Sequence, residues 1–218
     1  MTKERPISFT WPMVRAIREG RKTMTRRLIR PQPDECKTKF PSMRVMVADY
    51  CTGVPRLGQA YYARIAGCWN NTEPFFCPYL PGDRFYVREE WAFVPWPPLN
   101  RPDLCRVGAG GVGVTWRERW EPKNPSGYRW KSPKQMPRWA SRILVEVTAS
   151  RPERVMDISI ADIQREGLFA SLSQDPADMA DELRDKWRDL WNSLHAKRGF
   201  PYFGNPWVWA ITFQPVEV

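Results

Sequence analysis

Proline is concentrated in one stretch of this 218-residue chain and limits what that stretch can form. Eight prolines fall between Pro95 and Pro137, three of them in the sequence PWPP. Proline lacks a backbone N–H and fixes φ, so it is excluded from central strands and from helix interiors. We therefore interpret residues 95–137 as an insertion, ordered in the parts where its tryptophans pack.

Regular patterns on both sides of this insertion predict a mixture of strands and helices. Strands are expected in the opening PISFTWPM and over residues 21–30, 59–65, 84–94, 141–155 and 205–218. Helices are expected from Pro12 to Gly20, over 158–167 behind a Ser159–Asp162 capping box, and after Asp175. The last helix carries an apolar stripe at steps of three or four residues: Met179, Leu183, Trp187, Leu190, Trp191 and Leu194. These patterns predict an α+β fold with a small, curved or closed sheet, which the C-terminal strand is expected to close.

Length and composition favour one folded domain over residues 1–218, with loop-rich insertions at about 34–80 and 95–137. Hydrophobic residues make up 42% of the chain, which is enough for a core. Nowhere do about 18 apolar residues follow one another without a charge, and the N-terminus has no apolar signal-peptide region. The sequence therefore predicts no membrane contact, and we expect a cytoplasmic protein.

The cysteines and the histidine restrict the available chemistry. The five cysteines are Cys36, Cys51, Cys68, Cys77 and Cys105, an odd number without a C-x-x-C pair. Neither a disulfide framework nor a zinc ribbon is favoured, and we expect no metal and no cofactor. His195 is the only histidine, so multi-histidine metal sites are excluded, and a Ser-His-Asp triad is available only if His195 itself serves in it. An enzyme here must use lysine, carboxylate, hydroxyl or thiol groups.

A run of basic residues near the N-terminus is the densest functional signal. Lysine and arginine number 34 against 24 acidic residues, and residues 15–30 hold seven cations with one acid, Glu19. These cations are Arg15, Arg18, Arg21, Lys22, Arg26, Arg27 and Arg30. Such a field attracts phosphate, although a solvated charged face gives the same pattern. We select Arg21, Arg26 and Arg27 as candidate nucleic-acid contacts, together with Arg84 and Arg88, which share a face of their strand.

The proline-rich insertion is also basic. Its tryptophans are at positions 96, 116, 120 and 130. Counting Arg138, which directly follows the insertion, the cations near these tryptophans are Arg117, Arg119, Lys123, Arg129, Lys131, Lys134 and Arg138. Aromatic side chains that stand beside cations are typical of sites that bind unpaired nucleic acid. The insertion could therefore extend the nucleic-acid-binding surface of the basic run. Tryptophan also fills small cores well, and most of the 12 tryptophans are expected to be structural.

Four segments together resemble a known family. The sequences EGRKTMTRR, PGDRFYVREEW, SRILVEVT with DIQREGL, and NPWVWAITF are similar to the ASCH domain family of the PUA-like superfamily, in particular to its long phage and prophage members. The match covers roughly 1–30, 81–94 and 139–218. The resemblance implies a small β-barrel flanked by helices, with a cleft for RNA or a modified nucleoside.

One branch of that family removes the acyl group from N4-acetylcytidine with a lysine, a threonine and a glutamate. The matching positions here are Lys22 and Thr25 of G-R-K-T-x-T and Glu166 of REGL. A lysine can activate a hydroxyl only if its pKa falls, which nearby like charges and burial promote. Because Lys22 and Thr25 would face opposite sides of an ideal strand, this chemistry requires a turn near Gly20–Thr23. The alternative is an ion pair between Lys22 and Glu166 that latches helix to barrel.

The predicted partner is therefore RNA or a modified nucleoside, and single-stranded DNA stays an alternative. Three activities remain open at this point: deacylation of N4-acylated cytidine, a non-enzymatic nucleic-acid-binding role as a phage adaptor or regulator, and ribonuclease cleavage by the same fold. The small amidohydrolases of this family lack such insertions. The two insertions of this chain therefore argue against a free nucleoside as its substrate.

Overall fold

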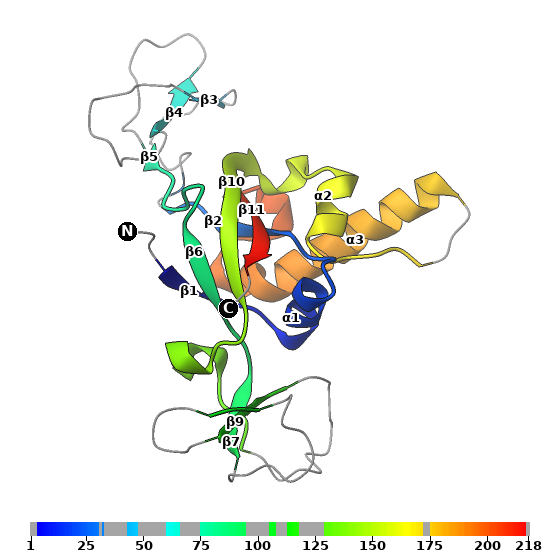
Figure 1. Ribbon diagram of the computed structural model, residues 1–218. Coiled ribbons are helices and arrows are strands. Elements are labelled where there is room, and N and C mark those ends of the chain that lie inside the picture. The colour runs from blue at the N-terminus through cyan, green and yellow to red at the C-terminus, as the bar shows by residue number, and fades with distance from the viewer. Residues whose placement is uncertain are drawn as a thin grey trace. The chain divides into compact units, whose positions relative to one another are not determined.

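The computed structural model describes residues 4–30, 32, 43–47, 60–65, 75–94, 105–107, 113–117, 129–171 and 175–216 (Figure 1). The chain divides into two compact units. The first comprises Met1–Lys22, Gly82–Glu146 and Phe213–Val218, and the second comprises Thr23–Pro81 and Val147–Thr212. Both are built from discontinuous segments, and the expected single domain over 1–218 with two insertions stays a prediction.

The first unit contains a parallel strand pair and the N-terminal helix. Strand β1 (Glu4–Ser8) runs parallel to β6 (Arg84–Arg88), which pairs antiparallel with the start of β10 (Leu144–Arg154). Helix α1 (Trp11–Arg18) begins with a proline in its first turn and buries Val14, Ala16 and Ile17. Gly20, at φ +72°, follows the helix in the left-handed conformation that glycine adopts at little cost, which confirms the predicted helix end.

A small three-stranded sheet in the first unit includes part of the proline-rich segment. Its order is β7 (Trp91–Val94), β9 (Gly113–Trp116) and β8 (Cys105–Val107), and all neighbours are antiparallel. Two short 3₁₀ helices follow, η3 (Pro133–Gln135) and η4 (Arg138–Ala140). The sheet and these helices share a core of Trp91, Val114, Trp116, Met136 and Ala140. Strands β8 and β9 lie between Pro102 and Pro122, where no proline prevents strand pairing.

This sheet corrects the predicted strand over 84–94. The chain leaves β6 after Arg88, and β7 begins at Trp91 in a different sheet. Between them the side chain of Glu89 is only 1% exposed and pairs with Arg142. Trp96 and Trp120 lie outside the described residues.

The second unit packs two helices against two strands. Strand β2 (Met24–Leu28) pairs antiparallel with Val208–Thr212 of β11 (Trp207–Val216). The side chains of Ser159 and Asp175 cap α2 (Ile160–Arg165) and α3 (Pro176–His195), as the sequence predicted. The core contains these buried residues: Val155, Ile158, Ile163, Leu183, Trp187, Trp191, Tyr202 and Val208. Leu194 is an exception to the predicted stripe, because its side chain is exposed.

The remaining described elements belong to the second unit. A three-stranded sheet has the order β3 (Met43–Val47), β4 (Ala60–Ile65) and β5 (Phe75–Phe76), and β4 confirms the strand expected over 59–65. Three 3₁₀ helices are η5 (Val155–Asp157), η6 (Ala196–Arg198) and η7 (Tyr202–Gly204). The other residues of 34–74 lie outside the described part of the chain.

The largest sheet has five strands in the order β1-β6-β10-β11-β2, and the predicted α+β class is confirmed. No closed barrel is found among the strands that the structure describes. The C-terminal strand β11 lies between β10 and β2, so the expectation that it closes the sheet was wrong. No helix in the described ranges combines the length and apolar character needed to cross a membrane.

Candidate functional site

Lys22 lies in the first unit, at the turn that follows α1. The backbone N–H groups of Arg21 and Lys22 both donate to the carbonyl of Ala16, at 2.8 and 2.9 Å. The Lys22 side chain is buried, with only 1% of the residue exposed, and its ammonium lies 5.5 Å from the centre of the Phe9 ring. A turn at Glu19 and Gly20 follows the helix, and strand β2 begins only at Met24, so Lys22 lies in irregular backbone ahead of the strand. A lysine buried to this extent is uncommon and needs compensating interactions.

Thr25 and Glu166 lie in the second unit, and both are buried. Thr25 stands on β2 opposite Ile211 of β11, and 5% of it is exposed. Glu166 ends α2, where its backbone N–H donates to the carbonyl of Asp162, and 4% of it is exposed. The Glu166 carboxylate accepts a hydrogen bond from Arg26 at 3.1 Å. Arg26 is thus a partner of Glu166 that sequence reasoning did not foresee.

The Arg26 guanidinium is the centre of a buried ion network in the second unit. Its side chain is 0% exposed, and it donates to three carboxylates: Glu153 at 2.5 Å, Glu166 at 3.1 Å and Asp162 at 3.2 Å. It also lies 5.6 Å from the centre of the Trp187 ring. Arg151 and Arg165 donate to Asp162 from the exposed side, and Arg151 also reaches Glu153. Carboxylates gathered around a buried guanidinium compensate its lost hydration, which is a structural role.

The other arginines selected from the sequence have different surroundings. Arg21 is exposed and donates to Glu19 at 2.7 Å. Burial lowers the pKa of Arg27 from its ordinary value, and Tyr79 and Glu166 oppose that shift. Arg84 donates to Glu146 at 3.0 Å, and Arg88 donates to the hydroxyl of Tyr86 at 3.1 Å.

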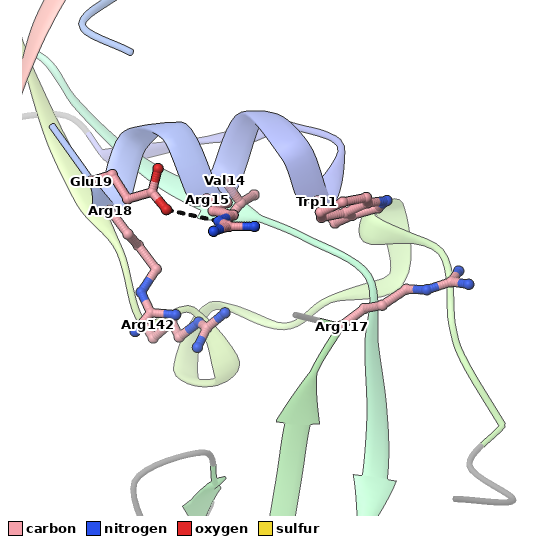
Figure 2. Close-up of a pocket in the computed structure, with 7 residues that line it drawn as sticks. All are labelled: Trp11, Val14, Arg15, Arg18, Glu19, Arg117 and Arg142. Atoms are coloured by element: carbon pink, nitrogen blue, oxygen red, sulfur yellow. Dashed lines mark hydrogen bonds and ion pairs between the residues drawn. The ribbon is translucent and has the colours of Figure 1, made fainter. Parts of the chain in front are cut away.

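A pocket of about 400 Å³ opens in the first unit beside α1 (Figure 2). Five of its lining residues come from α1 or the position after it, and two come from distant segments. They are Trp11, Val14, Arg15, Arg18, Glu19, Arg117 and Arg142. Four arginines and one carboxylate therefore face the same space. We call this site the arginine pocket.

Two of these arginines, Arg142 and Arg117, are held by carboxylates and aromatic rings that do not themselves line the pocket. Arg142 donates to both oxygens of Glu89 at 2.9 Å, and its guanidinium lies 4.4 Å from the centre of the Trp116 ring. Arg117 donates to Glu90 at 2.7 Å and lies 5.9 Å from the Trp130 ring centre. A two-point contact to a buried carboxylate and a ring behind the guanidinium hold Arg142 in one orientation. One wall of the pocket is thus preorganised.

The other charged residues of the pocket, Arg15, Arg18 and Glu19, lie on α1 or directly after it and form what we call its helical wall. Arg15 donates to Glu19 at 2.7 Å, and hydrogen bonds from Arg15 and then Arg21 hold the pKa of the Glu19 carboxyl below its ordinary value. Figure 2 shows Arg18 extending from α1 toward Arg142. Trp11, Arg15 and Arg18 share one face of the helix because they are three or four residues apart.

Sequence reasoning found part of this pocket. Arg15 and Arg18 belong to the basic run, and Arg117 belongs to the basic insertion, whereas Arg119 and Lys123 lie outside the described residues. Trp11 was not selected, although its spacing from Arg15 and Arg18 is a helical signal. Arg142 was missed because its position depends on the pairing of β10 with β6 and on the buried Glu89.

Comparisons with family models, with curated proteins and with solved structures gave no match. Within the described ranges, no group of three histidine, cysteine, aspartate or glutamate side chains has the arrangement of a metal site. The geometry of the residues themselves is therefore the basis for a functional proposal.

Proposed function

We propose that this chain is an ASCH-type protein with a PUA-like fold that binds RNA or a modified nucleoside in the cytosol. The observation that carries the proposal is the arginine pocket, in which four guanidinium groups and the Trp11 side chain line one space. Arginine binds phosphate in a fixed fork geometry, and an aromatic ring stacks on an unpaired base. A volume of about 400 Å³ lies within the range of small-ligand pockets, so it suits one nucleotide better than a duplex.

The electrostatic part of this proposal predicts a steep salt dependence. If the four arginines contact phosphates of a single strand, raising salt from about 50 to 200 mM should weaken binding by about 50-fold. Titration of a labelled single-stranded RNA with the full chain at both concentrations measures this. Equal affinity at the two concentrations, or no binding at the lower one, would contradict the proposal.

The same titration separates the alternatives. Single-stranded DNA of the same sequence tests whether the partner must be RNA, because only RNA has the 2′-hydroxyl. RNA that stays intact during a long incubation favours a binding protein, such as a phage adaptor or regulator. RNA that is cut into defined fragments favours a ribonuclease.

A second candidate function is deacylation of N4-acylated cytidine. The observation that favours it is the burial of Lys22, Thr25 and Glu166, which are 1%, 5% and 4% exposed, since charged side chains are rarely buried without a structural or chemical role. In this reaction Lys22 takes the proton of Thr25, whose oxygen attacks the acyl carbon. The C–N bond then breaks, the exocyclic amine leaves with a proton, and water hydrolyses the acyl-threonine ester to acetate.

This candidate is tested by acetate release from N4-acetylcytidine, free and within RNA. Lys22→Arg should abolish turnover, because a guanidinium keeps its proton at neutral pH, and Thr25→Ala should do the same. A melting curve of each variant keeps unfolding apart from loss of chemistry. Absence of turnover by the folded wild-type protein that still binds RNA would exclude the enzyme and leave the binding protein.

A further inference from the structure

Three cations of the first unit have different surroundings from the arginines that line the pocket. Within the described residues, no ion pair joins Arg88, Lys131 or Lys134 to a carboxylate. A charge of this kind is available to an anion, whereas an anion at a paired arginine competes with the carboxylate that is already there. We call these three residues, together with Phe93, the basic strip.

Neutral groups orient Arg88 at one end of the basic strip. Its guanidinium donates to the hydroxyl of Tyr86 at 3.1 Å and to the backbone carbonyl of Lys134 at 3.3 Å. It also lies 5.3 Å from the centre of the Tyr86 ring. These contacts fix the direction of the guanidinium without neutralising its charge. The contact with the carbonyl also places Arg88 beside the segment that carries Lys134 and Lys131.

Lys131 lies against an exposed aromatic ring at the other end of the basic strip. Its backbone N–H donates to the carbonyl of Trp91 in β7 at 2.7 Å. Its ammonium lies 4.1 Å from the centre of the Phe93 ring and 5.2 Å from that of Trp91. Phe93 is 45% exposed, whereas Trp91 is 3% exposed. A cation beside an open ring offers a phosphate contact and a stacking surface for a base at neighbouring points.

Trp116 of the proline-rich insertion does not supply this stacking surface. It is 5% exposed, and its Nε1 donates to the carbonyl of Ala140 at 2.9 Å, so it belongs to the core of the small sheet. Phe93 stands on β7 opposite Val114 of β9 and keeps its ring open to solvent. The exposed ring of this sheet is therefore one that the tryptophan pattern of the sequence did not indicate.

The basic strip adjoins the arginine pocket along the chain. Arg88 directly precedes Glu89 and Glu90, the carboxylates that hold Arg142 and Arg117. Lys131 directly follows residue 130, a tryptophan whose ring centre lies 5.9 Å from the guanidinium carbon of Arg117. The pocket and the strip thus belong to neighbouring segments of the same unit.

We propose that the basic strip binds the backbone of single-stranded RNA, with phosphodiesters at Arg88, Lys131 and Lys134 and an unpaired base against Phe93. The ligand is then a strand of several nucleotides rather than a free nucleoside. This proposal rests on the proposed function and deepens it. An open ring among cations favours a nucleic acid over an acidic polypeptide, because each nucleotide brings a flat base together with its charge.

The test compares two labelled single-stranded RNA oligomers, about three and about nine nucleotides long, with the full chain at one salt concentration. The short oligomer is long enough for the arginine pocket alone, whereas the long one also reaches the strip. A strand of about nine nucleotides offers about seven positions to a site of about three, so position number alone gives a gain of about sevenfold. We expect the long oligomer to bind about 50-fold or more tightly than the short one.

Lys131→Ala and Phe93→Leu are the decisive variants. Each should weaken binding of the long oligomer by about five- to tenfold and leave the short one unchanged. Lys131→Ala should also reduce the slope of log affinity against log salt by about 0.7, since it removes one phosphate contact. Leucine keeps an apolar contact with Trp91, and a melting curve shows that each variant is folded.

Matched controls come from the second unit. Lys197 is exposed on η6, and Phe203 is 75% exposed on η7. Lys197→Ala changes the net charge as Lys131→Ala does, and Phe203→Leu removes an exposed ring as Phe93→Leu does. Both control variants should bind the two oligomers as the wild type does.

The outcomes separate this proposal from RNA binding in general. A length gain of about sevenfold or less, or a larger gain that both decisive variants keep, overturns the role of the strip and leaves RNA binding intact. Equal weakening of both oligomers also overturns it, because the strip is then no separate contact. Absence of binding by either oligomer contradicts both proposals. Displacement of the long oligomer by polyglutamate as readily as by unlabelled RNA would assign the strip to acidic polypeptides instead.

Discussion

The buried ion network of the second unit and the arginine pocket of the first unit use the same residue types in different arrangements. In the network, one guanidinium that is fully shielded from solvent faces three carboxylates. In the pocket, four guanidinium groups and one carboxylate line an open space of about 400 Å³. In the network three carboxylates enclose one guanidinium, whereas in the pocket Arg15, Arg117 and Arg142 each pair with a carboxylate and still line the space that a ligand would occupy.

This difference shows why a basic sequence motif is ambiguous. Arg15, Arg18 and Arg26 belong to one run of cations, yet the first two line the pocket and the third is the centre of the network. Burial decides the role, because a buried charge must be paired within the protein and an exposed one is screened and exchangeable. We therefore assign Arg26 a structural role and propose a binding role for Arg15 and Arg18.

The largest effect should come from removing the centre of the network. Arg26→Met leaves Glu153, Asp162 and Glu166 facing one another in a buried site, so the free energy of unfolding should fall by about 3–5 kcal/mol. Urea unfolding of the variant and of Arg184→Ala, as a surface control, measures the difference. An Arg26→Met protein of unchanged stability with weakened RNA binding would reverse the assignment of the two regions.

A smaller effect concerns His195, a buried group among cations in the second unit. Burial, followed by Arg198, Arg27 and Arg30, lowers its pKa from 6.5 to about 4. In the described part of the chain, Nδ1 of His195 has no hydrogen-bond partner, and the ring stacks on Trp191 at 4.2 Å. Because the unfolded chain takes up the proton first, stability should be complete above pH 6.5 and should fall as the pH drops toward 4, by about 1–3 kcal/mol.

The measurement for His195 is urea unfolding at pH 7 and at pH 4.5 in wild type and His195→Gln. The wild type should lose more stability between these two pH values than the variant, since the carboxylates titrate in both proteins and only the histidine term differs. Identical losses would show that His195 is not held in its neutral form by the fold.

The smallest effect should come from the single carboxylate of the arginine pocket. Glu19→Gln removes a charge that is paired with Arg15 and Arg21, so RNA affinity should increase about two- to fivefold while the melting temperature stays essentially unchanged. Glu182→Gln on α3 is the matched control, because the pKa of Glu182 is lowered to about 2 and its loss changes the net charge equally. An equal increase in both variants would show that net charge acts, rather than the pocket.

The sequence predicted the elements whose signals are local. The proline before α1, the capping side chains of Ser159 and Asp175 and the buried Leu183, Trp187 and Trp191 all agree with the structure. The break in the strand over 84–94 was not predicted, and Glu89 within it pairs with Arg142, which is 53 residues away.

In the candidate site too, the sequence predicted local features but not contacts between distant residues. The basic run placed Arg15 and Arg18 on a surface for anions, because helical spacing is a local property. The three partners of Arg26 are 127 to 140 residues away in the chain, and no pattern in the sequence connects them. Local spacing therefore identified the helical wall of the pocket but could not separate binding arginines from structural ones.

The central claim is that the arginine pocket, and not the buried network, is where RNA binds. The most direct measurement is photo-crosslinking of the full chain to a single-stranded RNA that carries a photoreactive base, followed by mass spectrometry of the peptides. The claim predicts that crosslinks concentrate on the peptide containing Trp11 and disappear in Arg18→Ala. Crosslinks confined to peptides of the second unit, with none near Trp11, would contradict it.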